Sequence, residues 1–157
     1  MKTAFCADLV TLSPQCANEF NKCILRTHNK LRSTHKVGNL TVDLSLQEKA
    51  TAFSEKMAVE NFFAHSKGLA VLRMGENLAV GFRSNGFDVK RCGQIGKMFA
   101  EKWYNEIENY DFETGSKIRG MIGHFTQVVW KGTKRVGCGL AISTGNKAYI
   151  TCNYLPG

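Results

Sequence analysis

The run from Gly123 to Trp130 contains the residue best placed to do chemistry, His124. After the glycine, residue types alternate with the two-residue period of a pleated β-strand. A histidine at the entrance of a strand, next to a glycine, can direct its imidazole into a cleft that a mid-strand residue does not reach. The pattern therefore predicts a β-strand with His124 facing a cleft.

The chain has only four histidines, and a second one, His65, lies in a polar turn ahead of the pair Gly75-Glu76. Two imidazoles with nearby carboxylates are the equipment for binding zinc or activating water. The sequence contains neither a His-Glu-x-x-His helix nor a Gly-x-Ser-x-Gly turn. Ser66 follows His65 directly, and adjacent residues on a turn seldom align as nucleophile and base. We expect a non-enzymatic binding protein with no catalytic residues; the alternative is a metal-dependent hydrolase (protease or esterase) using the same cleft.

With 157 residues, of which 43% are apolar and 22% charged, the chain has the length and composition of one globular domain. No segment approaches the roughly 20 apolar residues needed to span a bilayer. The net charge of +8 favours acidic partners, such as anionic lipid headgroups, sulfated glycans or nucleic acid. Because the basic residues are spread without a basic run or a nucleic-acid-binding motif, we expect no dedicated nucleic-acid binding.

Six cysteines favour disulfides and an extracellular, oxidising compartment. The sequence has no Cys-x-x-Cys pair, which disfavours a zinc ribbon. Asn39-Leu40-Thr41 is a glycosylation sequon that is used only in such a compartment. Cys16 and Cys23 are too far apart on one helix to bridge each other. Cys92 is therefore expected to pair with one of the three N-terminal cysteines, leaving the other two to bond; the third N-terminal cysteine is Cys6.

Three amphipathic helices are predicted from apolar residues spaced three or four apart. The first covers about residues 15–35, the second opens with a capping box at Ser45 and Glu48, and the third begins near Asp88. A loop-rich stretch covers residues 65–86, and a glycine-containing loop covers 115–123. The apolar stripes are Phe20, Ile24, Thr27 and Leu31; Leu46, Ala50, Phe53 and Met57; and Ile95, Phe99, Trp103 and Ile107.

Residues 134–142 and 147–154 predict a β-hairpin around the turn at 144–146. A two-residue loop would set Cys138 opposite Asn153 and mix apolar with polar partners. A three-residue loop sets Cys138 opposite Cys152 and makes every pair on that face apolar, so this register is preferred. It also brings the two sulfurs within reach of a disulfide.

The reverse face of this hairpin carries the small residues Gly137, Gly139 and Ala141, which let a helix approach closely. A sheet that accepts helices on both faces implies an α+β fold, a three-layer α-β-α sandwich with a small antiparallel sheet.

Several blocks resemble the CAP superfamily, which comprises cysteine-rich secretory, antigen 5 and plant pathogenesis-related proteins. Residues 123–130 are similar to its principal motif, and residues 149–157 to the start of its second motif. Residues 28–32, 75–79 and 103–106 match further family blocks in the expected order. The chain is identified as a single CAP domain over residues 1–157, of the single-domain, venom-allergen-like branch.

The resemblance implies a central cleft formed by His65, Glu76, Glu106 and His124. In some relatives the two histidines bind a divalent metal, usually zinc. If both glutamates hydrogen-bond to the rings, a metal at His65 and His124 has only two protein ligands and is weakly bound. The competing interpretation is a polar network that ties these segments together without any ligand.

The resemblance also implies lipid or sterol binding. In lipid-binding relatives a loop in the position of residues 109–122 binds sterol; its apolar residues here are Tyr110, Phe112, Ile118, Met121 and Ile122. The alternative is a surface loop whose aromatics pack onto the sheet. A fatty-acid channel between helices, with Lys or Arg at its mouth, is a second lipid site. The expected protein is secreted, with a Golgi-associated, cytoplasmic branch as the alternative; its other candidate partners are an acidic surface, a protein target or a second copy in a homodimer.

Single residues outside the cleft carry smaller expectations. His28 lies on the first helix and is expected to contact the core. His35, near the end of that helix, is expected to interact with exposed carbonyls. Trp103 and Trp130 are both expected in the core.

Overall fold

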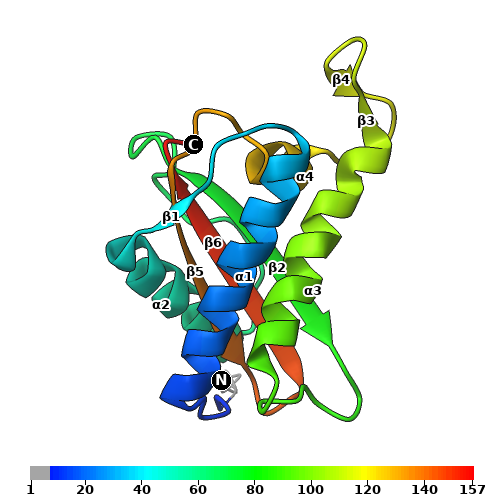
Figure 1. The fold of residues 1–157 in the computed structure, drawn as a ribbon. Helices are drawn as coiled ribbons and strands as arrows, with labels where there is room; N and C mark the ends of the chain where they lie inside the picture. Colours follow the sequence, from blue (N-terminus) through cyan, green and yellow to red (C-terminus); the bar gives the residue numbers. More distant parts are fainter. Residues whose placement is uncertain (1–7) are drawn as a thin grey trace.

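The computed structural model describes residues 8–157, which fold into three layers (Figure 1). A four-stranded sheet lies in the middle. One helix, α2 (Leu44–Glu60), packs on one face, and α1 (Pro14–Thr34) and α3 (Cys92–Tyr104) cover the other. The predicted α-β-α sandwich is confirmed. No helix within residues 8–157 is both long enough and apolar enough to cross a bilayer.

The sheet runs in the order β1 (Thr41–Val42), β5 (Arg135–Ile142), β6 (Lys147–Leu155) and β2 (Gly75–Phe82). Only β1 is parallel to its neighbour. After α3 the chain continues through a 3₁₀ turn, η1 (Asn105–Asn109), into a small hairpin of β3 (Tyr110–Asp111) and β4 (Ser116–Lys117). This hairpin protrudes from one end of the domain (Figure 1), and the short helix α4 (Gly123–Val128) follows it.

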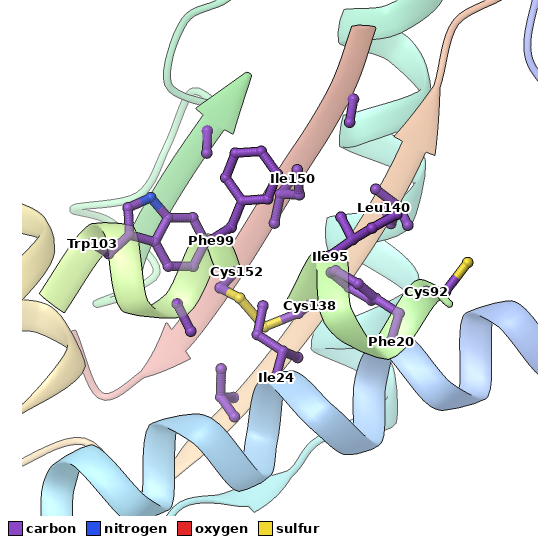
Figure 2. Close-up of a cluster of buried hydrophobic side chains, with 14 of the residues drawn as sticks. Phe20, Ile24, Cys92, Ile95, Phe99, Trp103, Cys138, Leu140, Ile150 and Cys152 are labelled. Carbon is purple, nitrogen blue, oxygen red and sulfur yellow. A yellow bond between two sulfur atoms is a disulfide. The ribbon is translucent and has the colours of Figure 1, made fainter. Parts of the chain in front are cut away.

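The hairpin of β5 and β6 has the predicted register, with Cys138 opposite Cys152. Ser143 and Lys147 close the turn through the bond from Ser143 N to Lys147 O at 2.9 Å, so the loop has three residues. The predicted disulfide joins Cys138 and Cys152. It is buried with Phe20, Ile24 and Phe99 between the sheet and the α1–α3 layer (Figure 2).

A second disulfide joins Cys16 on α1 to Cys92 at the start of α3. This confirms that Cys92 pairs with one of the N-terminal cysteines. Among residues 8–157, Cys23 forms no disulfide. Cys6, and with it the expected second bond of this group, lies outside the described residues.

The helices begin at identifiable caps. Ser13 Oγ accepts the N–H of Cys16 at 3.0 Å, and Pro14 occupies the first helical position of α1. The capping box predicted at Ser45 is wrong, because Asp43 caps α2 by accepting the N–H of Leu46 at 3.1 Å. Asp43 precedes the helix directly, whereas Ser45 already lies in its first turn.

Two predicted segments have a different structure. Residues 123–130 are not a strand: 123–128 form α4. The sequence pattern missed it because six helical residues are too few to show a 3.6-residue period, and the backbone N–H groups at its start are bound by a distant carboxylate, Glu106. The loop-rich stretch 65–86 contains β2, whose middle residues are buried on both faces and show no alternation.

Two side chains also differ from expectation. Trp103 is in the core, but Trp130 is 52% exposed, because it follows a helix and not a buried strand. His35 bonds through Nε2 to the Tyr104 hydroxyl at 2.8 Å rather than to helix carbonyls. The end of α1 is instead closed by its own backbone, where the N–H of His35 donates to Arg32 O.

The α2 layer packs directly on two glycines of β5, as predicted. A Cβ atom on Gly137 would lie 2.1 Å from the backbone nitrogen of Gln47, and one on Gly139 would lie 2.3 Å from Thr51 Cα. These neighbours are backbone atoms, so they cannot move aside without shifting the helix. The approach of α2 therefore requires glycine at both positions.

We predict that Gly137→Ala destabilises the domain by about 1–3 kcal/mol or more, because α2 must move away from the sheet. Urea unfolding followed by far-UV circular dichroism measures this change. Gly38→Ala is the control: nothing lies within 4 Å of its added Cβ, and we expect a change within about 0.5 kcal/mol. Equal stability of the two variants would contradict the close approach.

Candidate functional site

The first pair of site residues joins η1 to α4. His124 Nδ1 lies 2.6 Å from Glu106 Oε1, and Glu106 Oε2 accepts the backbone N–H groups of His124 and Phe125 at 2.8 and 3.1 Å. One carboxylate thus caps the start of α4 and orients the first imidazole on it. Because an ionised carboxylate only accepts, Nδ1 is the donor in this contact, and in a neutral ring the lone pair is then on Nε2.

The ring and backbone of His124 are held on two further sides. Its ring stacks on Trp103, with centroids 6.1 Å apart and planes 16° from parallel. Its carbonyl accepts a bond from Asn77 Nδ2 at 3.1 Å. The ring is therefore placed by α3, η1 and β2 together.

The second pair joins the loop after α2 to β2. His65 Nδ1 lies 2.9 Å from Glu76 Oε1, which also accepts the N–H of Ser66 at 2.9 Å. The Ser66 hydroxyl and the Asn153 amide donate to Oε2 at 2.6 and 3.1 Å. The Glu76 side chain is 1% exposed, whereas that of His65 is 59% exposed. A buried carboxylate with four donors thus orients a ring that faces solvent.

The two pairs have the same kind of contact, a glutamate oxygen at the Nδ1 atom of a histidine, and both pairs are in contact with strand β2. Glu76 and Asn77 are neighbours on β2, so the contact to His65 and the contact to the His124 backbone start from adjacent residues. The Ser66 hydroxyl is directed to Glu76 instead of His65, so the structure shows no serine–histidine nucleophile in this pair.

Few side chains at this site could act as ligands of a metal ion. Within residues 8–157, no group of three or more His, Cys, Asp or Glu side chains is placed to hold one ion. Structural zinc sites use four protein ligands and catalytic ones three. The described residues therefore contain no closed metal centre made of three or four such side chains.

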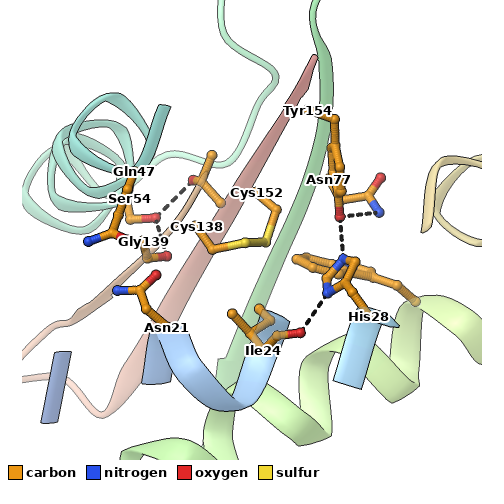
Figure 3. Close-up of a disulfide and its surroundings, with 12 residues drawn as sticks. Asn21, Ile24, His28, Gln47, Ser54, Asn77, Cys138, Gly139, Cys152 and Tyr154 are labelled. Atoms are coloured by element: carbon orange, nitrogen blue, oxygen red, sulfur yellow. Dashed lines mark hydrogen bonds between the residues drawn. A yellow bond between two sulfur atoms is a disulfide. The ribbon is translucent and has the colours of Figure 1, made fainter. Parts of the chain in front are cut away.

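A buried polar chain connects this site to α1 (Figure 3). His28 Nδ1 donates to Ile24 O at 2.8 Å, and its Nε2 lies 2.7 Å from the Tyr154 hydroxyl. Asn77 Nδ2 contacts the same hydroxyl at 3.3 Å and continues to the His124 carbonyl. Burial lowers the pKa of His28 to about 4 and raises that of Tyr154 above its usual value, so both remain neutral. His28 contacts the core as predicted; the sequence analysis missed Asn77 and Tyr154, although polar residues inside apolar strand blocks were a usable signal.

Arg32 was also missed by the sequence analysis. Its guanidinium is fully buried and donates to the carbonyls of Gly38, Val128, Trp130 and Thr133 at 2.8–3.1 Å. Burial lowers its pKa, yet an arginine remains charged in proteins. It therefore anchors the segment after α4 to the end of α1.

A cleft of about 500 Å³ lies between α1 and α3, outside the His–Glu pairs. Its floor includes Cys23, Thr27 and Gly93. The charged side chains that line it are Glu19, Arg26, Lys30, Lys90, Arg91 and Lys97. Five of these six are basic, which gives the cleft a positive rim.

The predicted lipid-binding loop divides into two groups. Tyr110 and Ile122 are partly buried, and Tyr110 packs edge-on against Phe125 with centroids 5.4 Å apart. Phe112, Ile118 and Met121 are 64–66% exposed. The alternative prediction is a loop whose aromatic side chains pack onto the sheet. Tyr110 is only partly buried and packs against Phe125 of α4, and Phe112 is exposed, so the structure does not have this arrangement.

Residues 25–154 match the cysteine-rich secretory protein family, CAP. The human Golgi-associated plant pathogenesis-related protein 1 is 32% identical over 145 residues, covering 92% of this chain and 88% of that protein. Secreted protein RBT4 of Candida albicans is 32% identical over 142 residues, covering 88% of this chain but 35% of that protein. The crystal structure of NaASP2 with Zn²⁺ matches with a TM-score of 0.68 and 21% identity over 93% of this chain and 84% of that one.

We predict that stability falls as the pH is lowered from about 6.5 towards 4, in part because of His28. The folded pKa of about 4 is below the ordinary 6.5, so only the unfolded chain takes up this proton in that window. The contribution is about 3 kcal/mol, complete above pH 6.5 and lost by about pH 4.

Urea unfolding at pH 7.5, 5 and 4 measures this effect. His28→Gln is expected to lose stability at pH 7.5, since it alters two buried hydrogen bonds, but to lose less on acidification than the original chain. An unchanged pH slope in His28→Gln would contradict the assignment.

Proposed function

This chain belongs to the cysteine-rich secretory protein family, and we propose that it is a lipid-binding protein whose ligand is an anionic lipid, such as a fatty acid, held between α1 and α3. The observation that carries the proposal is the cleft of about 500 Å³ with five basic side chains and one acidic side chain on its rim. Its volume lies within the range of small-molecule sites.

The chemistry of the cleft suits a molecule with one charged end and one apolar body. Long Lys and Arg side chains offer methylene stems to an acyl chain and a cationic head to a carboxylate. Gly93 forms part of the floor, where a Cβ would lie 2.6 Å from Cys23 Sγ, so the two helices meet closely below the opening. We propose this cleft as the fatty-acid channel between helices that the resemblance implies.

We place the protein outside the cell. Two disulfides support an oxidising compartment, and one of its relatives carries the name of a secreted protein. The alternative location, cytoplasmic and Golgi-associated, has the support of the relative with that name.

A second proposed ligand is a weakly bound divalent cation, such as zinc, at His65 and His124. The specific support is that both rings have Nδ1 fixed by a carboxylate and Nε2 uncommitted. A zinc ion bound there would supply a Lewis acid. With two protein ligands and water the ion would exchange readily, and the two glutamates would keep their structural roles whether or not it is bound.

The exposed apolar residues of the 109–122 loop remain the candidate sterol element. Binding of labelled cholesterol and binding of palmitate are measured on the same variant. Met121→Ser should weaken cholesterol binding and leave palmitate binding unchanged, which separates the two lipid sites.

We predict that the chain binds palmitate with saturation and that Arg26→Glu weakens this binding about tenfold by placing a negative charge at the carboxylate. Titration calorimetry or displacement of a fluorescent fatty acid measures it. Lys56→Glu makes the same charge change on an exposed part of α2, on the other face of the sheet, and should bind normally. An equal loss in both variants, or no binding at all, would overturn the cleft as the site.

We predict that zinc shifts the ring resonances of His65 and His124 in NMR spectra and that either His→Ala change abolishes the shift at the other ring. Glu106→Gln should weaken zinc binding about 10- to 100-fold, because it loosens the ring orientation. His35→Ala removes a histidine outside the site and serves as the control. Zinc shifts that survive the double change of His65 and His124 would rule out this site.

A further inference from the structure

Exposed basic side chains gather on the face of the domain where α1 and α3 lie side by side (Figure 1). On α1, Lys22, Arg26 and Lys30 are exposed and follow one another at four-residue intervals, so they form one stripe along the helix. At about 1.5 Å per residue the stripe is about 12 Å long. The segment that leads into α3 and forms its first half adds four exposed basic side chains: Arg83, Lys90, Arg91 and Lys97. We call these seven residues the basic surface.

The opposite face of the domain has no such excess of positive charge. There α2 carries three exposed glutamates and two exposed lysines: Glu48, Glu55, Glu60, Lys49 and Lys56. Among the seven residues of the basic surface lie only three acidic ones: Glu19, Asp88 and Glu101. The net charge of +8 is therefore distributed unevenly, and the positive potential is strongest over α1 and α3.

Most side chains of the basic surface have no acidic partner. Within residues 8–157, five of them form no salt bridge: Lys22, Arg26, Lys30, Arg83 and Lys90. Arg91 pairs with Asp88 and Lys97 with Glu101, each with 3.8 Å between nitrogen and oxygen, and these four side chains are 49% to 69% exposed. Because such exposed pairs contribute little free energy, an anionic ligand can replace the carboxylates.

Two adjoining hollows give the basic surface an elongated shape. Arg91 and Gln94 line the cleft between α1 and α3, and the same two residues line a second hollow of about 170 Å³. Arg83 lies in this second hollow, on the other side of the start of α3. An extended ligand can therefore run from the stripe on α1, across the start of α3, to Arg83.

The start of α3 adds a second attraction for anions. No side chain caps this helix end, and its first turn holds no acidic residue. Gly93 and Gln94 of the first turn line the cleft, so the positive end of the helix dipole lies at the basic surface. The Cys16–Cys92 disulfide ties this end to the start of α1. The two helices therefore present their charges in a fixed arrangement.

The apolar side chains that two other kinds of polyanion need are missing from this surface. Single-stranded nucleic acid stacks its bases on aromatic rings in a basic groove, and docking on a bilayer needs apolar side chains that enter the headgroup region. In residues 14–34 and 83–104, the only large apolar side chain that is exposed is Val89, at 39%. A ligand that offers charge without bases or acyl chains fits best.

We propose that the basic surface binds a sulfated polysaccharide. Its sulfate groups contact the lysine and arginine side chains of both helices, and one of them lies at the start of α3. Such polymers are extracellular, which agrees with the oxidising compartment that the disulfides support. This function goes beyond fatty-acid binding and does not depend on a ligand inside the cleft, because Lys22 and Arg83 lie outside the cleft lining.

Titration calorimetry of the full chain with a heparin hexasaccharide tests the proposal. We expect saturable binding, a Kd that rises with added salt, and loss of binding when the sugar is desulfated. Lys22→Gln and Arg83→Gln should each weaken binding about three- to tenfold and lower the slope of log Kd against log salt by about one, because each removes one ionic contact. Lys56→Gln is the matched control, since it removes an exposed lysine from α2, and it should bind as the original chain does.

NMR spectra give a second readout that needs no variant. The hexasaccharide should shift the amide resonances of residues 22–30 and 83–97 and leave those of residues 44–60 unchanged. Palmitate binding separates this proposal from the fatty-acid site, because Arg83 lines only the second hollow and Arg83→Gln should bind palmitate normally. A chain that binds palmitate but not the hexasaccharide would refute the polysaccharide site alone.

Other outcomes also overturn the proposal. One is equal binding of sulfated and desulfated sugar, and another is the same loss of affinity in Lys56→Gln as in Lys22→Gln. Tighter binding of single-stranded DNA than of heparin would assign the surface to nucleic acid, and stronger binding to phosphatidylserine vesicles would assign it to a membrane.

Discussion

The buried hydrogen-bond chain from His28 through Tyr154 and Asn77 to the His124 carbonyl fixes α1, the sheet and α4 relative to one another. It joins α1, β6, β2 and α4, which are far apart in sequence, and the side chains of His28, Tyr154 and Asn77 are buried where water cannot replace a lost partner. An unpaired polar group in such a place costs about 1–3 kcal/mol. The position of α4, and with it the imidazole of His124, is therefore fixed by the core and not by its own short helix.

Because of the two glutamates, the structural network and the proposed metal site use the same residues. Glu106 closes the start of α4, and Glu76 closes the loop at Ser66, each with both carboxylate oxygens. The same bonds set the tautomer of the neighbouring histidine. A polar network that is needed for folding therefore leaves two oriented Nε2 atoms, so the choice between network and metal site posed by the sequence is not exclusive.

The two faces of the sheet are used differently. On the α2 face, glycines at 137 and 139 bring helix and strand backbones together and leave little room for a ligand. On the other face, α1 and α3 cross closely at Gly93 and Gly96, and the groove outside this contact collects basic side chains from both helices. The buried Arg32 joins this layer to the segment that presents Trp130, so α1 both lines the cleft and anchors the chain after α4.

Local pattern alone determined the hairpin register, the Cys138–Cys152 bond, the three long helices and the layering, because period, loop length and small residues on one face act between neighbours along the chain. The family blocks also supplied the two His–Glu pairs, but not their bonds. Only the tertiary structure decided that residues 123–128 are helical, that Trp130 is exposed, and that Arg26, Lys30 and Lys97 share one cleft. Each of these depends on a partner far away in sequence: a carboxylate at Glu106, a guanidinium at Arg32, or a second helix.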